Sequence, residues 1–270
     1  MSNVNKRQPA VFLPHGGGPC SFMDWTWGPA DTWDATRRFL EGLAATLPEP
    51  PKALVVISGH WEEPAFTASA AAKPEMIFDY TGFPEHTYRL TWPAPGDPEL
   101  ATRVRDLLAQ AGLPAGLSAS RGFDHGVFVP LKVAFPEAQI PVVTLSLAAS
   151  LDPALHLAAG RALAPLRDEG VLIVGSGMSF HNLRGYFRVE TAERARAFDA
   201  WLRAAVELPA AERGALLTGW REGPFATYAH PREEHLIPLM VAAGAGGGAP
   251  GSRIFTDEPM GAAISAYRFD

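Results

Sequence analysis

The sequence predicts an α/β fold in which helices flank a mixed, mostly parallel central sheet, and three observations support this. Short apolar runs rich in Val, Ile and Leu alternate along the chain with helical patterns. These runs show no polar alternation, as expected for strands that are covered on both faces. No linker divides the 270 residues, so we expect a single domain over residues 1–270.

Four short apolar runs predict the buried strands of this sheet. They cover residues 10–13, 53–58, 142–147 and 171–175. Three further segments are weaker strand candidates, and the last of them alternates like an edge strand. They cover residues 66–69, 88–90 and 263–269.

Helical periodicity and capping residues predict the helices between the strands. The helix over residues 98–112 is well delimited, because Asp97 suits its N-cap, Pro98 its first turn and Gly112 its end. The other expected helices cover residues 31–46, 127–135, 153–169, 191–208 and 210–221, and one more starts at Pro231. The glycine-rich stretch 242–251 is expected to be a flexible surface loop.

Composition and charge exclude several classes of function. With 23 Lys and Arg against 29 Asp and Glu, the net charge is −6, so nucleic acid is not an expected partner. The apolar runs are far shorter than the roughly 20 residues of a membrane helix, and the N-terminus carries no targeting signal, so we expect a cytoplasmic protein. The one cysteine, Cys20, excludes a disulfide framework, a thiolate zinc site and an iron–sulfur cluster held by this chain alone. A transition metal would therefore need imidazole or carboxylate ligands, and the chain has eight histidines.

Three histidines follow expected strands through glycine-containing turns. His15 precedes three glycines, His60 follows a glycine, and His181 comes after two glycines at the end of its strand. Because ligands of open α/β sheets bind beyond the carboxyl ends of the strands, we expect these side chains to converge there.

Three more histidines lie near expected helix starts. His125 directly precedes the helix over residues 127–135, where free N–H groups suit an anionic substrate or intermediate. His230 and His235 are five residues apart and would not chelate as a pair on one helix. We expect one of them to be a ligand, and the other to contact the substrate or support the helix start.

The remaining histidines and the glycine motifs give less information about function. His156 is expected to be structural, and His86 has no assigned role. Neither phosphate-binding glycine pattern, G-x-x-x-x-G-K-[ST] or G-x-G-x-x-G, occurs at the glycine run 16–18, and the G-x-S-x-G pattern of serine hydrolases is absent from the chain.

Six segments stand out as motifs along the chain. They read His-Gly-Gly-Gly-Pro at 15–19, Ser-Gly-His-Trp at 58–61, Tyr-Arg-Leu-Thr-Trp-Pro-Ala-Pro-Gly at 88–96, Asp-His-Gly at 124–126, Gly-Ser-Gly-Met-Ser-Phe-His-Asn at 175–182 and His-Pro-Arg-Glu-Glu-His at 230–235. In this order, and over nearly the whole chain, they resemble the class III extradiol dioxygenases, specifically the single-chain DOPA-dioxygenase-type branch.

The resemblance implies a metal site with Fe(II) for activity, and Zn(II) in the isolated protein is consistent with it. His15 and His60 would be metal ligands. His235 would take the place of the third ligand, which is a glutamate in the related protocatechuate 4,5-dioxygenase β-subunit. His181 would be the acid/base residue beside the metal, or a fourth ligand, and His125 would line the substrate pocket and assist proton transfer.

The third ligand bears on the identity of the metal. Two histidines and one carboxylate are the usual ligands of O₂-activating Fe(II), whereas three histidines with an open position are also typical of zinc. Glu234 lies next to His235 and could support or replace it. The expected substrate contacts are His230 and the aromatic side chains of Trp61 and Phe180.

The implied reaction is the opening of a catechol ring next to its diol by O₂. His181 is the expected base, because an imidazole can take and return a proton near neutral pH. Two alternatives stay open: a zinc-dependent hydrolase that uses the same histidines, and a non-catalytic metal-binding relative. The sequence leaves the particular catechol and the oligomeric state open.

Overall fold

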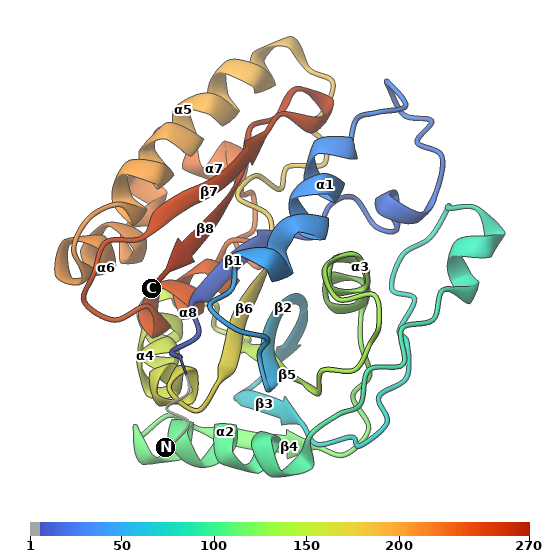
Figure 1. Ribbon diagram of the computed structural model, residues 1–270. Helices are drawn as coiled ribbons and strands as arrows, with labels where there is room; N and C mark the ends of the chain where they lie inside the picture. Colours follow the sequence, from blue (N-terminus) through green and yellow to red (C-terminus); the bar gives the residue numbers. More distant parts are fainter. Residues whose placement is uncertain (1–5) are drawn as a thin grey trace.

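The computed structural model describes residues 6–270, and eight strands form one sheet through the middle of the molecule (Figure 1). They are β1 Ala10–Pro14, β2 Ala53–Glu63, β3 Phe66–Ser69, β4 Ala115–Ser118, β5 Val142–Ala148, β6 Val171–Gly177, β7 Ser252–Asp257 and β8 Ile264–Phe269. Their order across the sheet is β4-β3-β5-β2-β6-β1-β8-β7. The predicted α/β class with a mixed sheet is confirmed.

Four parallel strands, β5, β2, β6 and β1, form the centre of the sheet. All residues of β1, β5 and β6 are buried, which explains why these runs carry no polar alternation. The outer pairs β3 with β5, β8 with β1 and β7 with β8 are antiparallel. Because the central strands run in one direction, their carboxyl ends meet at one edge of the sheet.

Helices cover both faces of the sheet. They are α1 Asp34–Gly42, α2 Pro98–Gln110, α3 His125–Ala134, α4 Pro153–Leu163, α5 Val189–Val206, α6 Ala210–Thr218, α7 Ala226–Ala229 and α8 Ile237–Ala245. Short 3₁₀ helices cover Cys20–Phe22, Leu43–Thr46, Glu85–Arg89, Ala164–Arg167, Trp220–Glu222 and Pro259–Gly261. None of the helices within residues 6–270 combines the length and apolar character needed to cross a membrane.

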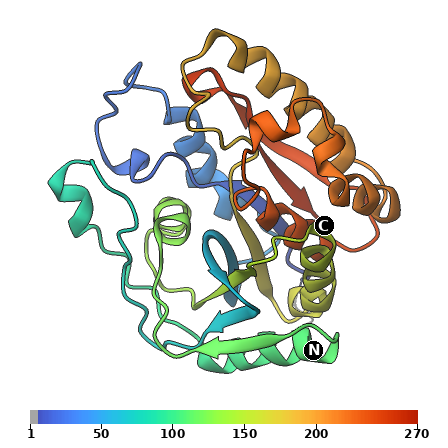
Figure 2. The same ribbon diagram turned by 180° about the vertical axis from the view of Figure 1, so that it is seen from behind.

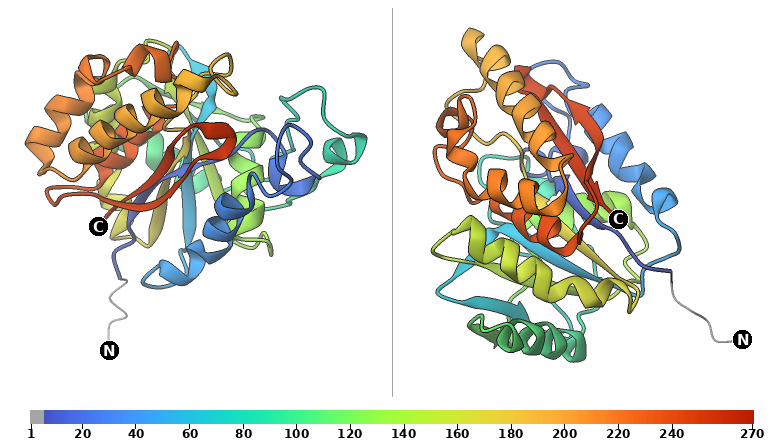
Figure 3. Two further views of the ribbon diagram at one scale, coloured as in Figure 1. Left: turned by 90° about the horizontal axis from the view of Figure 1, so that it is seen from above. Right: turned by 90° about the vertical axis from the view of Figure 1, so that its left-hand side faces the viewer.

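The two faces of the sheet bury separate apolar cores. Val11 and Val56 point to the face that α1 and α3 cover, whereas Phe12, Val55 and Ile57 point to the face covered by α2, α4, α5, α6 and α8. Views from behind and from above show this layering, with α1 and α3 on one side and the larger group of helices on the other (Figures 2 and 3).

Several predicted elements differ from the structure. The segment 88–90 is not a strand; it belongs to or adjoins the 3₁₀ helix Glu85–Arg89, in which the Thr87 hydroxyl donates to the Pro84 carbonyl (2.7 Å) and tightens the turn. No helix starts at Pro231, because residues 233–236 form a turn closed by a hydrogen bond from Leu236 N–H to the Glu233 carbonyl (2.8 Å).

Other differences concern element ends. The stretch 242–251 is a loop only in its second half, since α8 continues to Ala245 with its alanines buried. The helices expected over 31–46 and 153–169 each end in a 3₁₀ turn. The short strand β4 and the partly exposed strand β7 have no apolar pattern that would have predicted them.

His156 joins the start of α4 to the end of β5 and is structural, as expected. Its ring is fully buried, its Nδ1–H donates to the Asp152 carbonyl (2.7 Å), and its Nε2 accepts from Ala148 N–H (3.1 Å). Burial lowers the pKa of His156 to about 4, so the folded protein favours the neutral ring. Protonation would destroy the acceptor at Nε2.

We predict that His156→Gln lowers the free energy of unfolding at about pH 7.5 by about 1–3 kcal/mol. The gap to the unchanged protein should narrow by about 2 kcal/mol between about pH 7.5 and pH 5. The reason is that a histidine with a lowered folded pKa loses its stabilising contribution as the pH falls below the unfolded value near 6.5. Urea unfolding of both metal-free proteins at the two pH values measures this.

The matched control is His86→Gln, because His86 is exposed and, within residues 6–270, its side chain hydrogen-bonds only the Phe22 carbonyl. It should change the free energy of unfolding by less than about 0.5 kcal/mol. A gap for His156→Gln that stays constant with pH would contradict the prediction.

Candidate active site

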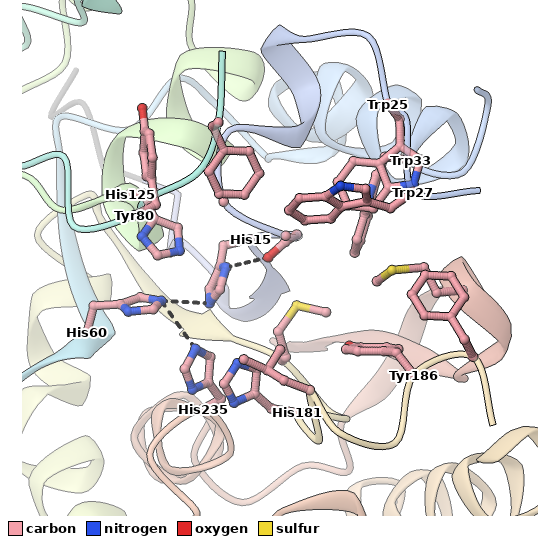
Figure 4. A pocket seen from close by; sticks show the side chains of 18 residues that line it. His15, Trp25, Trp27, Trp33, His60, Tyr80, His125, His181, Tyr186 and His235 are labelled. Carbon is pink, nitrogen blue, oxygen red and sulfur yellow. Dashed lines mark hydrogen bonds between the residues drawn. The ribbon is translucent and has the colours of Figure 1, made fainter. Parts of the chain in front are cut away.

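Three histidines meet at the carboxyl end of the central strands. His15 directly follows β1, His60 lies on β2, and His235 lies in the turn before α8. The Nε2 atom of His60 is 3.3 Å from Nε2 of His15 and 3.2 Å from Nε2 of His235 (Figure 4). Three ligand atoms, one from each ring, therefore face one point.

Glycines on the neighbouring strands let the His235 segment reach this position. A side chain at Gly177 would collide with the His235 carbonyl, and one at Gly175 would collide with the Pro238 carbonyl. In the space so left, Met178 N–H donates to the His235 carbonyl (3.0 Å). The two glycines at the end of β6 thus serve close backbone approach, one of the roles for which glycine is used.

Each of the three rings is oriented through its other nitrogen. Nδ1 of His15 is 2.9 Å from the Gly16 carbonyl, and Nδ1 of His235 is 2.8 Å from a Glu234 carboxylate oxygen. A carbonyl and a carboxylate only accept, so both Nδ1 atoms carry the proton and both Nε2 atoms present a lone pair. Nδ1 of His60 lies 3.5 Å from Asp79 Oδ2, which favours the same tautomer.

The chemistry of this donor set fits a transition metal. Burial, reinforced by the neighbouring histidines, holds the pKa values of His15 and His235 well below the usual range, and burial lowers that of His60 to about 3. Neutral imidazoles are what metal binding requires. Metal–nitrogen bonds of about 2.1 Å in a tetrahedral site place donor atoms about 3.4 Å apart, close to the spacing observed. Without a cation, three converging lone pairs repel one another.

Glu234 connects two of the histidines behind the cluster. Its Oε1 accepts from His235 Nδ1 and lies 3.4 Å from His181 Nδ1, and the His181 ring stacks on His235 with centroids 3.4 Å apart. Burial raises the pKa of Glu234, but the hydrogen bond with His181, a backbone hydrogen bond and the nearby charges of His181 and Arg232 together lower it below its usual value. Because Glu234 meets the Nδ1 side of His235, it lies behind the donor set and supports His235.

Asp79 plays the corresponding part for His125, which begins α3. Asp79 Oδ1 accepts from the backbone N–H (3.0 Å) and from Nδ1 (2.7 Å) of His125, whose ring centroid lies 4.0 Å from that of His60. Burial raises the pKa of Asp79, yet the hydrogen bonds from His125 bring it down to about 2. The ionised carboxylate therefore fixes the Nδ1–H tautomer and leaves the Nε2 lone pair of His125 free.

The histidines form one end of a cavity of about 480 Å³. Figure 4 shows His15, His60, His125, His181 and His235 gathered on one side and the aromatic residues Trp25, Trp27, Trp33 and Tyr186 on the other. The other residues of the wall are Gly16, Gly17, Gly18, Tyr80, Phe83, Met178, Leu183, Phe187 and Met260. The cavity is thus polar at one end and apolar over the rest.

The predicted site residues divide into those that the structure brings together and those that it does not. His15, His60, His125, His181 and His235 all line the cavity. The three expected substrate contacts are not part of its wall.

Each of these three packs elsewhere for a clear physical reason. His230 is fully buried between Phe198 and Trp220, with Nε2 2.9 Å from the Ser179 carbonyl. Trp61 follows His60 on a strand, so it points to the opposite face, where Arg121 stacks over its ring. Phe180 packs against Tyr186 and Tyr228. All three side chains therefore lie outside the cavity wall, and their contact with a substrate stays a prediction.

Asp79 and the tryptophans of the cavity are functional candidates that sequence reasoning missed. Asp79 lies in an irregular segment with no motif around it. Trp25, Trp27 and Trp33 follow the motif at 15–19, and their number within nine residues is a signal that could have drawn attention to them.

Comparisons with known proteins show which family the chain is similar to. Residues 9–269 match the family described as the catalytic LigB subunit of aromatic ring-opening dioxygenase. The chain is 38% identical over 273 residues to a dioxygenase of Hapsidospora irregularis (96% of this chain, 84% of that protein). It is 39% identical over 251 residues to a 4,5-DOPA dioxygenase extradiol of Beta vulgaris (92% and 90%). The crystal structure of an uncharacterized Escherichia coli K12 protein matches with a TM-score of 0.78 and 31% identity, over 98% of this chain and 100% of that one.

We predict that Glu234→Gln lowers the affinity for Zn²⁺ by about 10- to 100-fold, because an amide cannot hold the His235 tautomer as a carboxylate does. Competition with a chromophoric chelator measures the affinity. The matched control is Glu233→Gln, whose carboxylate pairs with Arg221 (2.7 Å) and does not line the cavity. Equal affinities of the two variants would rule out this supporting role of Glu234.

Proposed function

Because the chain belongs to the family of the catalytic LigB subunit of aromatic ring-opening dioxygenases, it is an extradiol dioxygenase, and we propose that it uses O₂ to open the ring of a catechol bound at the histidine cluster. Both oxygen atoms enter the product, and the ring breaks next to the diol to give a semialdehyde. Relatives named 4,5-DOPA dioxygenase extradiol, at 35–39% identity over most of the chain, support this reaction class.

One observation carries the proposal: three neutral imidazoles present their Nε2 lone pairs to one point at the end of an apolar cavity. Such a donor set holds a divalent transition metal and leaves other positions open for small ligands. A catechol ring fits the apolar walls, and its two hydroxyl oxygens suit the polar end.

We propose His15, His60 and His235 as the residues that hold the metal, with Fe(II) as the active ion and Zn(II) as an ion that the same set accepts. When bound, the ion supplies Lewis acidity toward the diol oxygens and, as iron, a redox couple for O₂. All three protein donors are then imidazoles, since Glu234 is engaged on the Nδ1 side of His235.

His181 and His125 are the proposed acid/base residues. Each has its Nδ1 turned toward a carboxylate, Glu234 or Asp79, which leaves Nε2 as the atom that exchanges a proton. Both side chains line the cavity beside the metal donors. A base at this place can take a proton from a diol hydroxyl and return it later to an oxygen of the opening ring.

The proposal treats the chain as one catalytic domain over residues 1–270. The cavity wall draws on segments spread from His15 to Met260, so the site needs most of the length of the chain.

The test is anaerobic reconstitution with Fe(II), followed by 4-methylcatechol and isotopically labelled O₂. We expect one O₂ consumed per ring opened and both labelled atoms in the product. Turnover that needs no O₂, or that is equal with Zn(II), which has no redox couple for O₂, would overturn the proposal. Metal-free protein and Fe(II) without protein are the controls.

We predict that His181→Gln lowers kcat by about 100- to 10,000-fold, the usual contribution of a general acid/base group, while bound iron stays near the level of the unchanged protein. His15→Ala should instead lose the iron. Metal analysis after gel filtration, together with O₂ uptake, separates the two outcomes. Loss of iron from His181→Gln would assign His181 to the donor set.

A further inference from the structure

We infer that the substrate is a catechol with an uncharged, apolar substituent, and that the cavity disfavours catechols whose side chain carries a carboxylate. The inference rests on the proposed function for the position of the diol. It goes further in assigning the rest of the cavity to the substituent.

The cavity is too large for a catechol ring alone. An engineered cavity of about 150 Å³ holds a benzene molecule, whereas this one measures about 480 Å³. With the diol at the histidines, the remaining space lies toward Trp25, Trp27, Trp33 and Tyr186 (Figure 4). A substituent on the ring would therefore extend among aromatic side chains.

No charged partner for a carboxylate lines this space. Among residues 6–270, the wall of the cavity contains no Lys, Arg, Asp or Glu. Arg121 and Arg232, near the polar end, are engaged with Asp124 (2.7 Å) and with Glu62 and Glu234. An ionised group placed in such a wall would lose its hydration without gaining a counter-charge.

The fixed charges behind the histidines also oppose an anionic substrate. Asp79 and Glu234 are carboxylates that orient His125 and His235, and each accepts a hydrogen bond from an Nδ1–H group (2.7 and 2.8 Å). They favour a bound cation at the polar end and repel a second anion further along the cavity.

Two hydroxyl groups and two indole N–H groups of the cavity wall are already hydrogen-bonded or out of reach of a ligand. The hydroxyl of Tyr80 donates to the Thr87 carbonyl (2.6 Å), and that of Tyr186 to the Phe180 carbonyl (3.4 Å). The indole N–H groups of Trp25 and Trp33 have no partner, but both atoms are closed off from solvent and from the cavity. Most of the wall that remains for a substituent is apolar, formed by aromatic rings, Leu183 and the methionine side chains.

The rim of the cavity is exposed and apolar. Trp27 is 49% exposed, Leu183 71% and Phe187 65%. Several exposed apolar side chains grouped around one opening are typical of a binding surface. Phe187 and Met260 also have φ angles of 66° and 53°. Bulky residues rarely adopt this left-handed region, and such positions concentrate at ligand sites.

The test uses three catechols whose side chains share two methylenes and differ in the terminal group: 4-propylcatechol ends in a methyl, 3-(3,4-dihydroxyphenyl)propionate in a carboxylate and dopamine in an ammonium group. We expect the specificity constant for 4-propylcatechol to exceed that for the propionate by at least about 100-fold. It should also exceed the specificity constant for 4-methylcatechol by about 10-fold, because 4-propylcatechol buries two more methylenes. Anaerobic quenching of tryptophan fluorescence should give the same order of affinities.

A variant pair checks the place of the substituent. Trp27→Arg introduces a cation at the exposed rim and should raise the propionate relative to 4-propylcatechol by about 10-fold, because a charged partner is then available. The matched control Trp27→Gln removes the ring without adding charge and should weaken 4-propylcatechol without favouring the propionate. Leu183→Arg, at the more exposed position, repeats the test if Trp27→Arg folds poorly.

The outcomes separate the inference from the proposed function. If the specificity constant for the propionate or for dopamine equals or exceeds that for 4-propylcatechol, the inference is overturned while the dioxygenase activity stands. If none of the catechols is cleaved, the proposed function fails. In that case, quenching of tryptophan fluorescence by 4-propylcatechol but not by the propionate would still support an apolar ligand site. Quenching by the propionate but not by 4-propylcatechol would overturn the inference.

Discussion

Three imidazole lone pairs directed at one point are an unfavourable arrangement without a cation, and much of the structure serves to maintain it. Hydrogen bonds at the Nδ1 atoms orient the His15 and His235 rings, and the Asp79 carboxylate faces the third. Neighbouring positions of β2, β6 and β1 in the sheet bring two of the rings together. Gly175 and Gly177 make room for the segment that carries the other. The geometry is therefore fixed before any ligand arrives, which is how a metal site gains affinity and selectivity.

The same carboxylates have a second effect through their charge. Asp79 and Glu234 stabilise protonated Nδ1 atoms and a cation at the Nε2 side, and they place negative potential at the polar end of the cavity. The apolar end has no charge to balance them among the described residues of the wall. The two halves of the cavity therefore select for different properties of one molecule, a deprotonatable diol at one end and an uncharged body at the other.

Much of the fold could be predicted from the sequence, because buried parallel strands leave a strong local pattern, as in residues 10–13 and 171–175. The histidines at strand ends were predictable for the same reason, since a strand and its glycine turn fix where the next side chain points. Residues placed by long-range contact were not: Asp79 reaches His125 from an irregular segment. Trp61 shows the opposite kind of difference. It is next to His60 in the sequence, which suggested that the two share a site, but strand alternation directs the Trp61 side chain to the other face of the sheet.

The two ends of the cavity are built from different structural elements, the central strands at one end and surface connections at the other. His15 and His60 belong to the central strands or follow them directly, whereas Trp27, Leu183 and Met260 lie in connecting segments on the surface. Connections tolerate substitution far better than buried strands do. Homologous proteins can therefore change which substituent they accept while they keep the same reaction. A directed-evolution library aimed at new catechols would vary these connections and keep the residues of the sheet constant.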